Sequence, residues 1–240
     1  MAKKTDTGTY DELRARIKEG KLSGAFIFHG EETYLRDRTL EQMRAALIPK
    51  GSEEFNLRTL NAPVSAEDVA HAVDSVPMLC DRTMVIVRDM DLYKLSESAQ
   101  SSIMSTLSEV PEYCTLIFIY DTVSYKPDGR KKISSVIKQA ALTVDFSLRS
   151  NQTLIPWVRK HFKSGGKDIS AREAEYLIFK AGQQMGVLHG EIEKLIAFAK
   201  GESITSEDID AVVIPSLEAE SFQLASTVSS GKGKIGRAHV

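Results

Sequence analysis

The chain has 240 residues, of which 42% are hydrophobic and 27% charged, a balance typical of a water-soluble protein with one large or two modest domains. Its net charge of −2 lacks the basic excess of proteins that bind nucleic acid on their own. We expect neither a membrane span nor a secretory signal, because no apolar run is long enough and the first residues have no apolar core. A cytoplasmic location is therefore expected.

The first predicted elements are a helix, a strand and a second helix. Thr9 and Glu12 fit a capping box, which would begin a helix that ends near Gly20. Residues 25–29 are apolar throughout and predict a central strand that is covered on both faces. Residues 35–47 predict a helix whose apolar stripe comprises Leu40, Met43 and Leu47.

Strands and helices continue to alternate up to residue 146. The further predicted strands are residues 55–60, 84–87, 116–120 and 142–146. Between the first two of these lies a predicted helix that begins at Ser65 and ends at Pro77. Its predicted buried face consists of Val69, Val73 and Val76. This alternation indicates an α/β fold with a parallel sheet and helices on both faces.

Beyond residue 146 the strand pattern ends. Apolar residues at helical spacing predict a small all-helical unit over residues 147–213. A different segment, residues 214–234, begins a further helix at Leu217 with nothing after it to pack on. Residues 235–240 match the translation of a common sequencing-adapter read. We therefore expect these six residues to be an assembly artefact and the natural chain to be longer.

The turn after the first strand lies where P-loop proteins hold phosphate, yet its residues do not suit that chemistry. A P-loop needs a second glycine for the turn, a lysine for the phosphates and a hydroxyl for Mg²⁺. Counted from Gly30, these positions hold Leu35, Arg36 and Asp37. Glu31 and Glu32 would face phosphate oxygens and repel them. We predict a degenerate phosphate loop with no cofactor and no metal; the alternative is an NTPase with a divergent P-loop.

Three other groups of residues have competing interpretations. Asp89 and Asp91 follow the strand at 84–87 and could bind Mg²⁺, but without a phosphate loop they are expected to cap the following turn. Cys80 and Cys114 lack metal-ligand spacing and are expected to be buried thiols. A basic loop either faces DNA phosphates or is simply solvated; its residues are Lys126, Arg130, Lys131 and Lys132.

Five segments between residues 22 and 213 match the order of motifs in a known family. They are 28–35 (FHGEETYL), 54–57 (EFNL), 85–89 (VIVRD), the basic loop 126–132 and 190–195 (GEIEKL). Together they resemble the delta subunit family of the bacterial DNA polymerase III clamp loader. The resemblance implies an AAA+-like α/β domain (1–146) without a working P-loop, a helical lid domain (147–213) and the start of a truncated collar domain (214–234).

The same resemblance implies a role in DNA replication. The chain would bind and open the sliding clamp (beta subunit), beside gamma or tau and delta-prime subunits and primer-template DNA. No catalysis by the chain itself is implied, since the DNA-directed DNA polymerase (nucleotidyltransferase) activity belongs to the complex. The family contacts the clamp through a hydrophobic pair before the third strand, which Met78 and Leu79 match, in place of leucine and phenylalanine. From the residues alone, the pair would instead fill the core.

Overall fold

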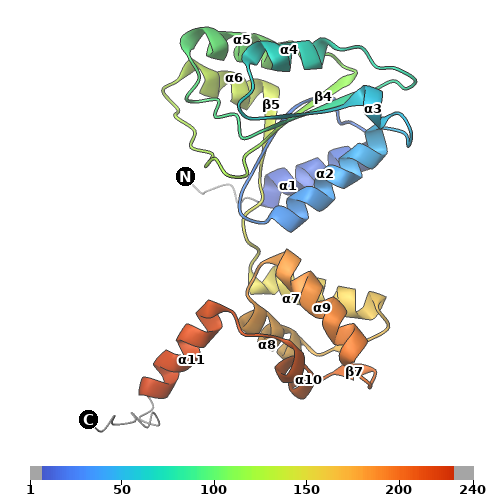
Figure 1. The fold of residues 1–240 in the computed structure, drawn as a ribbon, viewed down its shortest axis with the longest axis vertical. Coiled ribbons are helices and arrows are strands. Elements are labelled where there is room, and N and C mark those ends of the chain that lie inside the picture. The colour runs from blue at the N-terminus through green and yellow to red at the C-terminus, as the bar shows by residue number, and fades with distance from the viewer. Residues whose placement is uncertain (1–6, 230–240) are drawn as a thin grey trace. The chain divides into compact units, whose positions relative to one another are not determined.

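The computed structural model describes residues 7–229 of the chain. These residues divide into two compact units, with the boundary between Ser147 and Leu148. The first unit is built on a sheet and the second mostly on helices (Figure 1). Within residues 7–229, no helix has both the length and the apolar character that crossing a membrane requires.

A five-stranded sheet of parallel strands forms the centre of the first unit, in the order β2-β3-β4-β1-β5. Its strands are β1 (Gly24–His29), β2 (Leu57–Asn61), β3 (Thr83–Arg88), β4 (Cys114–Ile119) and β5 (Ala141–Asp145). β1, β3 and β4 are almost wholly buried, as their continuous apolar runs predict. β2 is an edge strand with three exposed residues.

Helices cover both faces of this sheet, which confirms the predicted α/β fold (Figure 1). The helices of the first unit are α1 (Thr7–Glu19), α2 (Thr33–Leu47), α3 (Glu53–Asn56), α4 (Ala66–Asp74), α5 (Glu97–Ser108) and α6 (Lys132–Ala140). α1 and α2 bury Leu13 and Met43 against one face. α4, α5 and α6 bury Val69, Ile103 and Ile133 against the other. Apolar residues on both faces of the central strands require this two-sided cover.

The predicted start of the first helix and the predicted second strand are wrong at their boundaries. α1 begins at Thr7 and runs through the predicted Thr9 cap, because a cap is a local preference of about 1 kcal/mol that does not prevent a longer helix. Residues 53–56 form α3, so β2 begins only at Leu57 and Phe55 is exposed. The carbonyl of Ser52 closes this turn by accepting two backbone N–H groups, which apolar alternation cannot reveal.

The predicted end of the third helix is also wrong. α4 begins at the predicted Ser65 cap, with the capping box formed by Asp68, but it ends at Asp74. Pro77 disfavours helical backbone at the residue before it, and the Ser75 hydroxyl donates to the His71 carbonyl at the helix end. Val76 therefore leaves the buried face and is 68% exposed.

Up to Ser229, where the described residues end, the second unit contains four packed helices and a fifth that follows them. They are α7 (Asn151–Ser164), α8 (Ala171–Ala181), α9 (Met185–Phe198), α10 (Ser206–Val212) and α11 (Leu217–Ser229). The prediction of an all-helical unit is wrong in one detail: β6 (Asp168–Ile169) pairs with β7 (Ser203–Ile204) in parallel. Strands of two residues are too short for a periodic pattern to predict.

Two assignments for the second unit remain predictions. They are the lid role of residues 147–213 and the collar role of residues 214–234. The predicted adapter-derived residues 235–240, together with residues 230–234, lie outside the described residues.

Candidate functional site

The turn after β1 is held against the end of β5 by backbone contacts. The backbone N–H of Phe146 donates to the His29 carbonyl, and that of Glu32 donates to the Phe146 carbonyl, both at 2.7 Å. Gly30 has φ +120°, and a Cβ there would lie 2.4 Å from the Phe146 carbonyl carbon. This position therefore needs glycine for the close approach of two backbones. The Glu32 N–H, which a phosphate loop would offer to its ligand, is used within the protein.

The side chains of this turn do not face a common ligand space. The expectation that Glu31 and Glu32 both point toward phosphate is wrong for Glu32, whose side chain is buried. Glu31 is exposed. Leu35, at the position of the second P-loop glycine, packs against the hydrophobic core beneath the sheet. The sheet core and the end of β5 determine the shape of this turn, because its backbone and its apolar side chain both contact them.

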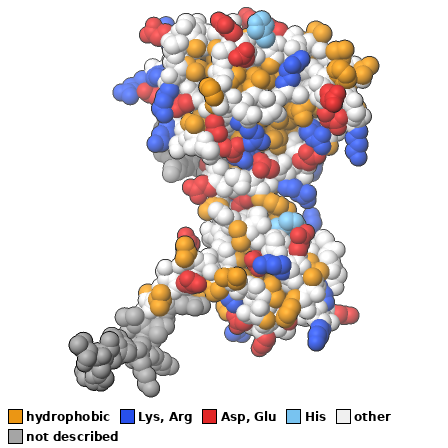
Figure 2. Space-filling view, viewed as in Figure 1, with side chains coloured by type: hydrophobic (Ala, Val, Ile, Leu, Met, Phe, Trp, Pro, Cys, Tyr) orange, Lys and Arg blue, Asp and Glu red, His pale blue; other side chains and the backbone are white. Residues whose placement is uncertain are grey.

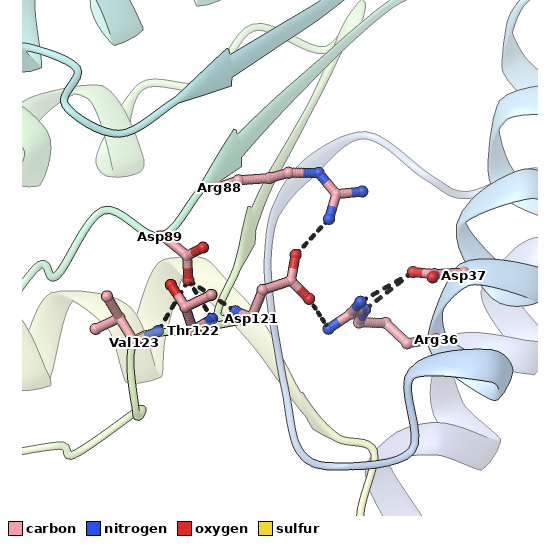
Figure 3. A network of polar contacts seen from close by, with 7 residues as sticks. All are labelled: Arg36, Asp37, Arg88, Asp89, Asp121, Thr122 and Val123. Carbon is pink, nitrogen blue, oxygen red and sulfur yellow. Dashed lines mark hydrogen bonds and ion pairs between the residues drawn. The ribbon is translucent and has the colours of Figure 1, made fainter.

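Arg36, at the position of the P-loop lysine, is neutralised by carboxylates of the protein (Figure 3). Its side chain is only 3% exposed, and its Nη1 lies 2.5 Å from Oδ1 of Asp121. Its Nη2 lies 3.1 Å from Oδ1 of Asp37, which occupies the P-loop hydroxyl position. The second oxygen of Asp121 pairs with the guanidinium of Arg88. Two arginines from α2 and β3 thus share one carboxylate that follows β4.

Asp89 adopts left-handed backbone, with φ +58°, directly after β3. Its Oδ1 accepts the backbone N–H groups of Asp121, Thr122 and Val123 at 2.8, 2.8 and 3.0 Å (Figure 3). Burial tends to raise the pKa of Asp89, but these hydrogen bonds outweigh it and hold the pKa below the ordinary value. Asp89 therefore caps a turn, but the predicted turn is wrong: it binds the loop after β4 and not the turn that follows β3.

Asp91 also binds its own neighbourhood. Its carboxylate accepts the backbone N–H of Tyr93 and lies 3.0 Å from Nζ of Lys94. Across the described part of the chain, no group of three or more His, Cys, Asp and Glu side chains is placed to hold a metal ion. These contacts match the capping role predicted for Asp91.

A small crevice remains between the carboxyl ends of β1 and β4. Its volume is about 260 Å³, below the roughly 300–1,000 Å³ that is usual for ligand sites. It is lined by His29, Gly30, Glu31 and residues 120–125. The His29 ring stacks on Tyr125 with centroids 4.6 Å apart, which closes one wall. The carboxyl edge of the sheet, where α/β proteins usually bind ligands, is thus largely filled by the protein's own side chains.

The loop between α4 and β3, residues 75–82, has the opposite character. It exposes three apolar side chains, Val76 (68%), Met78 (53%) and Leu79 (83%). The expectation from the residues alone, that Met78 and Leu79 fill the core, is wrong. Hydrophobic side chains lie at the edge of the first unit where this loop runs (Figures 1 and 2). Leu79 has φ +63°, a conformation that a bulky residue seldom adopts unless its surroundings impose it.

Asn56, the last residue of α3, holds this loop. Its side chain is buried, donates from Nδ2 to the Met78 carbonyl at 2.6 Å and accepts the Met78 N–H at 2.8 Å. Nδ2 also donates to the Ser52 carbonyl at 2.9 Å. Reasoning from the sequence missed both Asn56 and the exposed Val76. The signal that could have pointed to Asn56 is its place in segment 54–57 (EFNL), one of the five segments that carry the family resemblance.

The basic loop before α6 is exposed at all four predicted positions. Arg130 pairs with Asp128 at 3.0 Å, and the ammonium of Lys131 donates to the Tyr93 carbonyl. Lys126 and Lys132 are exposed, and neither forms an ion pair within residues 7–229. A DNA-facing role for this loop remains a prediction.

The two cysteines differ in their surroundings. Cys114 is buried in β4, and burial raises the pKa of its thiol. Cys80 is partly exposed in the α4–β3 loop, so the prediction of a buried thiol is wrong there. The early end of α4 is the reason, because it leaves the residues before β3 outside the core.

Comparison with known proteins gives matches along most of the chain. The family model described as "DNA polymerase III, delta subunit" matches residues 26–147. DNA polymerase III subunit delta of Bacillus subtilis (strain 168) is 24% identical over 223 residues, which cover 90% of this chain and 64% of that protein. The chain thus spans somewhat less than two thirds of the length of this curated relative.

Two solved structures share the fold. The DNA clamp loader delta protein of Bacillus subtilis superposes with a TM-score of 0.66 at 22% identity. The match covers 93% of this chain and 68% of the Bacillus subtilis chain. RuvB of Thermotoga maritima, a Holliday junction branch migration motor, superposes with a TM-score of 0.53 at 12% identity. The match covers 86% of this chain and 67% of the RuvB chain. These likenesses indicate an AAA+-like fold.

Proposed function

The chain belongs to the DNA polymerase III delta subunit family, and from this premise we propose that it binds and opens the sliding clamp as a non-hydrolysing subunit of a bacterial clamp loader. Its partners in the cytoplasm are the ring-shaped clamp (beta subunit), the gamma or tau and delta-prime subunits, and primer-template DNA held within the complex. Polymerisation of DNA belongs to the holoenzyme.

The observation that carries this proposal is the exposure of Met78 and Leu79 on a loop whose backbone is held in place. Large apolar side chains in water favour a partner with a complementary pocket. Anchors of this kind commonly contribute about 2 kcal/mol or more each to an interface. The left-handed backbone at Leu79 turns that side chain outward, where it is 83% exposed. Val76 adds apolar area beside the pair.

The contacts around the turn after β1 support the non-hydrolysing part of the proposal. Arg36 and Arg88 are engaged by Asp121, and the Glu32 N–H is engaged by Phe146. A bound triphosphate would have to displace these internal contacts before it gained any of its own. ATP bound by neighbouring subunits therefore supplies the energy for clamp loading.

The experiment is equilibrium binding of a fluorescently labelled bacterial sliding clamp, such as that of Bacillus subtilis, to the 240-residue chain at moderate salt. The double variant Met78→Ala, Leu79→Ala should bind roughly 1,000-fold more weakly, since two anchors of about 2 kcal/mol each are lost. Phe198→Ala in the second unit removes a comparably exposed apolar side chain and should leave the affinity unchanged. Binding of the double variant as tight as that of the parent would refute the anchor assignment.

A second measurement addresses the alternative of an NTPase with a divergent P-loop. Calorimetric titration of the chain with Mg-ATP should give no binding in the micromolar range. A micromolar affinity would contradict the non-hydrolysing assignment and favour the alternative.

A further inference from the structure

We propose that Asn56 is a positioning residue for clamp binding, because its side-chain amide holds Met78 and Leu79 in the conformation that the clamp recognises. This inference rests on the proposed function and adds to it a residue from outside the α4–β3 loop. Asn56 itself is buried and does not reach the surface where a clamp would dock.

The amide of Asn56 fits the loop in one orientation. Its Oδ1 faces the N–H of Met78, which can only donate, and its Nδ2 faces the carbonyls of Met78 and Ser52, which can only accept. Both backbone polar groups of Met78 are thus bound by one side chain that lies 22 positions earlier in the chain. An amide is the side chain that can satisfy a donor and an acceptor at the same time.

The sheet explains why a side chain is needed here. β2 and β3 pair in parallel from Leu57 and Met84 onward, so the ladder has not begun at Met78. The residue just before β2 is Asn56, and its amide bonds Met78 as a neighbouring strand would. A buried or half-buried backbone without such a partner would be free to take other conformations.

The residue next to this contact is the one under backbone strain. Leu79 has φ +63°, which leucine avoids on its own. With Met78 held on both its N–H and its carbonyl, the chain leaves the contact in a set direction and Leu79 projects outward. Binding then requires no ordering of the loop, and this lowers its entropic cost.

The test uses Asn56→Asp, which keeps the shape but places a carboxylate oxygen against two carbonyls. We expect clamp affinity to fall by about tenfold as the preorganised loop is lost, with the chain still folded as judged by circular dichroism. Asn56→Ala, which removes the amide without adding charge, is the second variant. Asn61→Ala, at the exposed far end of β2, is the matched control and should bind as the parent does.

A double-mutant comparison separates positioning from a general structural role. In the Met78→Ala, Leu79→Ala background, Asn56→Ala should weaken clamp binding no further, because the side chains that it positions are gone. An equal loss in both backgrounds would overturn the inference. So would clamp affinity equal to that of the parent in both Asn56 variants.

Hydrogen exchange gives a readout that does not depend on the clamp. The Met78 amide should exchange at least tenfold faster in Asn56→Ala than in the parent, while the Val85 amide inside β3 should be unchanged. Unchanged exchange at Met78 would overturn the inference. Failure of the parent chain itself to bind the clamp would instead refute the proposed function, and the exchange result would still decide whether Asn56 holds the loop.

Discussion

The turn after β1 lies at the carboxyl ends of the parallel strands, and the loop before β3 lies at their amino ends. The polar side chains at the carboxyl ends are paired within the protein, whereas the apolar side chains of the loop are exposed. At the carboxyl edge, Arg36, Arg88 and Asp121 bind one another. At the amino edge, Met78 and Leu79 remain exposed. Ligands of open α/β sheets usually bind at the carboxyl edge. In this chain, the polar groups at the carboxyl edge are bound to one another and leave few groups for a ligand. The exposed apolar side chains lie at the amino edge instead.

The contrast teaches how a fold can keep the form of a nucleotide site without its chemistry. Polar groups that are already paired add nothing to ligand binding, because a ligand only exchanges one partner for another. Exposed apolar side chains, by contrast, gain free energy from any partner that removes them from water. The following four substitutions test the two sides of this comparison, from the largest expected effect to the smallest.

Gly30→Ala tests whether the corner needs glycine for backbone contact. The new Cβ would lie 2.4 and 2.5 Å from the Phe146 carbonyl carbon and oxygen, at a φ of +120°. We expect a loss of about 3 kcal/mol or more in the free energy of unfolding, measured by urea denaturation. Gly129→Ala, where a Cβ meets open space, is the control and should change stability little. A loss below about 1 kcal/mol for Gly30→Ala would contradict the tight approach.

Asp121→Ala tests whether the corner is held by its internal ion pairs. The substitution leaves the buried guanidinium of Arg36 with only the exposed Asp37 as its partner. The free energy of unfolding should fall by about 2–3 kcal/mol, because a buried charge loses its counter-ion. Glu175→Ala, at an exposed position in α8, should change it by less than about 0.5 kcal/mol. Equal effects of the two substitutions would show that the pair is not needed.

Leu79→Asn separates the backbone of the α4–β3 loop from its apolar side chain. Asparagine tolerates left-handed backbone, so the loop should keep its conformation while the anchor is lost. Clamp affinity should fall about 30-fold, as for one anchor of about 2 kcal/mol, and the free energy of unfolding should stay within about 0.5 kcal/mol. A large loss of stability would mean that Leu79 belongs to the core after all.

Asp89→Asn tests whether the negative charge of Asp89 stabilises the loop after β4 that its carboxylate binds. The pKa of Asp89 in the folded chain lies below its ordinary value, so its carboxylate stabilises the fold at pH values above the unfolded-state pKa of about 3.9. At pH 7 the variant should be less stable by about 1 kcal/mol, since a neutral acceptor replaces a charged one. As the pH falls through the folded-state pKa this difference should disappear. A difference that stays constant from pH 7 down to pH 2 would exclude the charge as its cause.

Much of the first unit was predictable because its signals are local. Continuous apolar runs predicted β1, β3 and β4, and the capping residue Ser65 begins a helix as expected. The sequence also indicated that the turn after β1 is unsuited to phosphate, because P-loop chemistry depends on residue types at fixed spacing and these positions hold Leu35, Arg36 and Asp37. Periodicity and spacing operate over a few residues, and the sequence displays them directly.

The tertiary structure alone decided what the apolar and polar residues near β3 do. Val76 and Leu79 look like core residues in the sequence, yet α4 ends early and leaves them in solvent. Asn56 looks like part of a strand, yet it closes α3 and binds a residue 22 positions away. The carboxylates that pair with Arg36 are those of its neighbour Asp37 in α2 and of Asp121 in the loop after β4. Contacts between distant segments depend on how the sheet brings those segments together, and no local pattern records that.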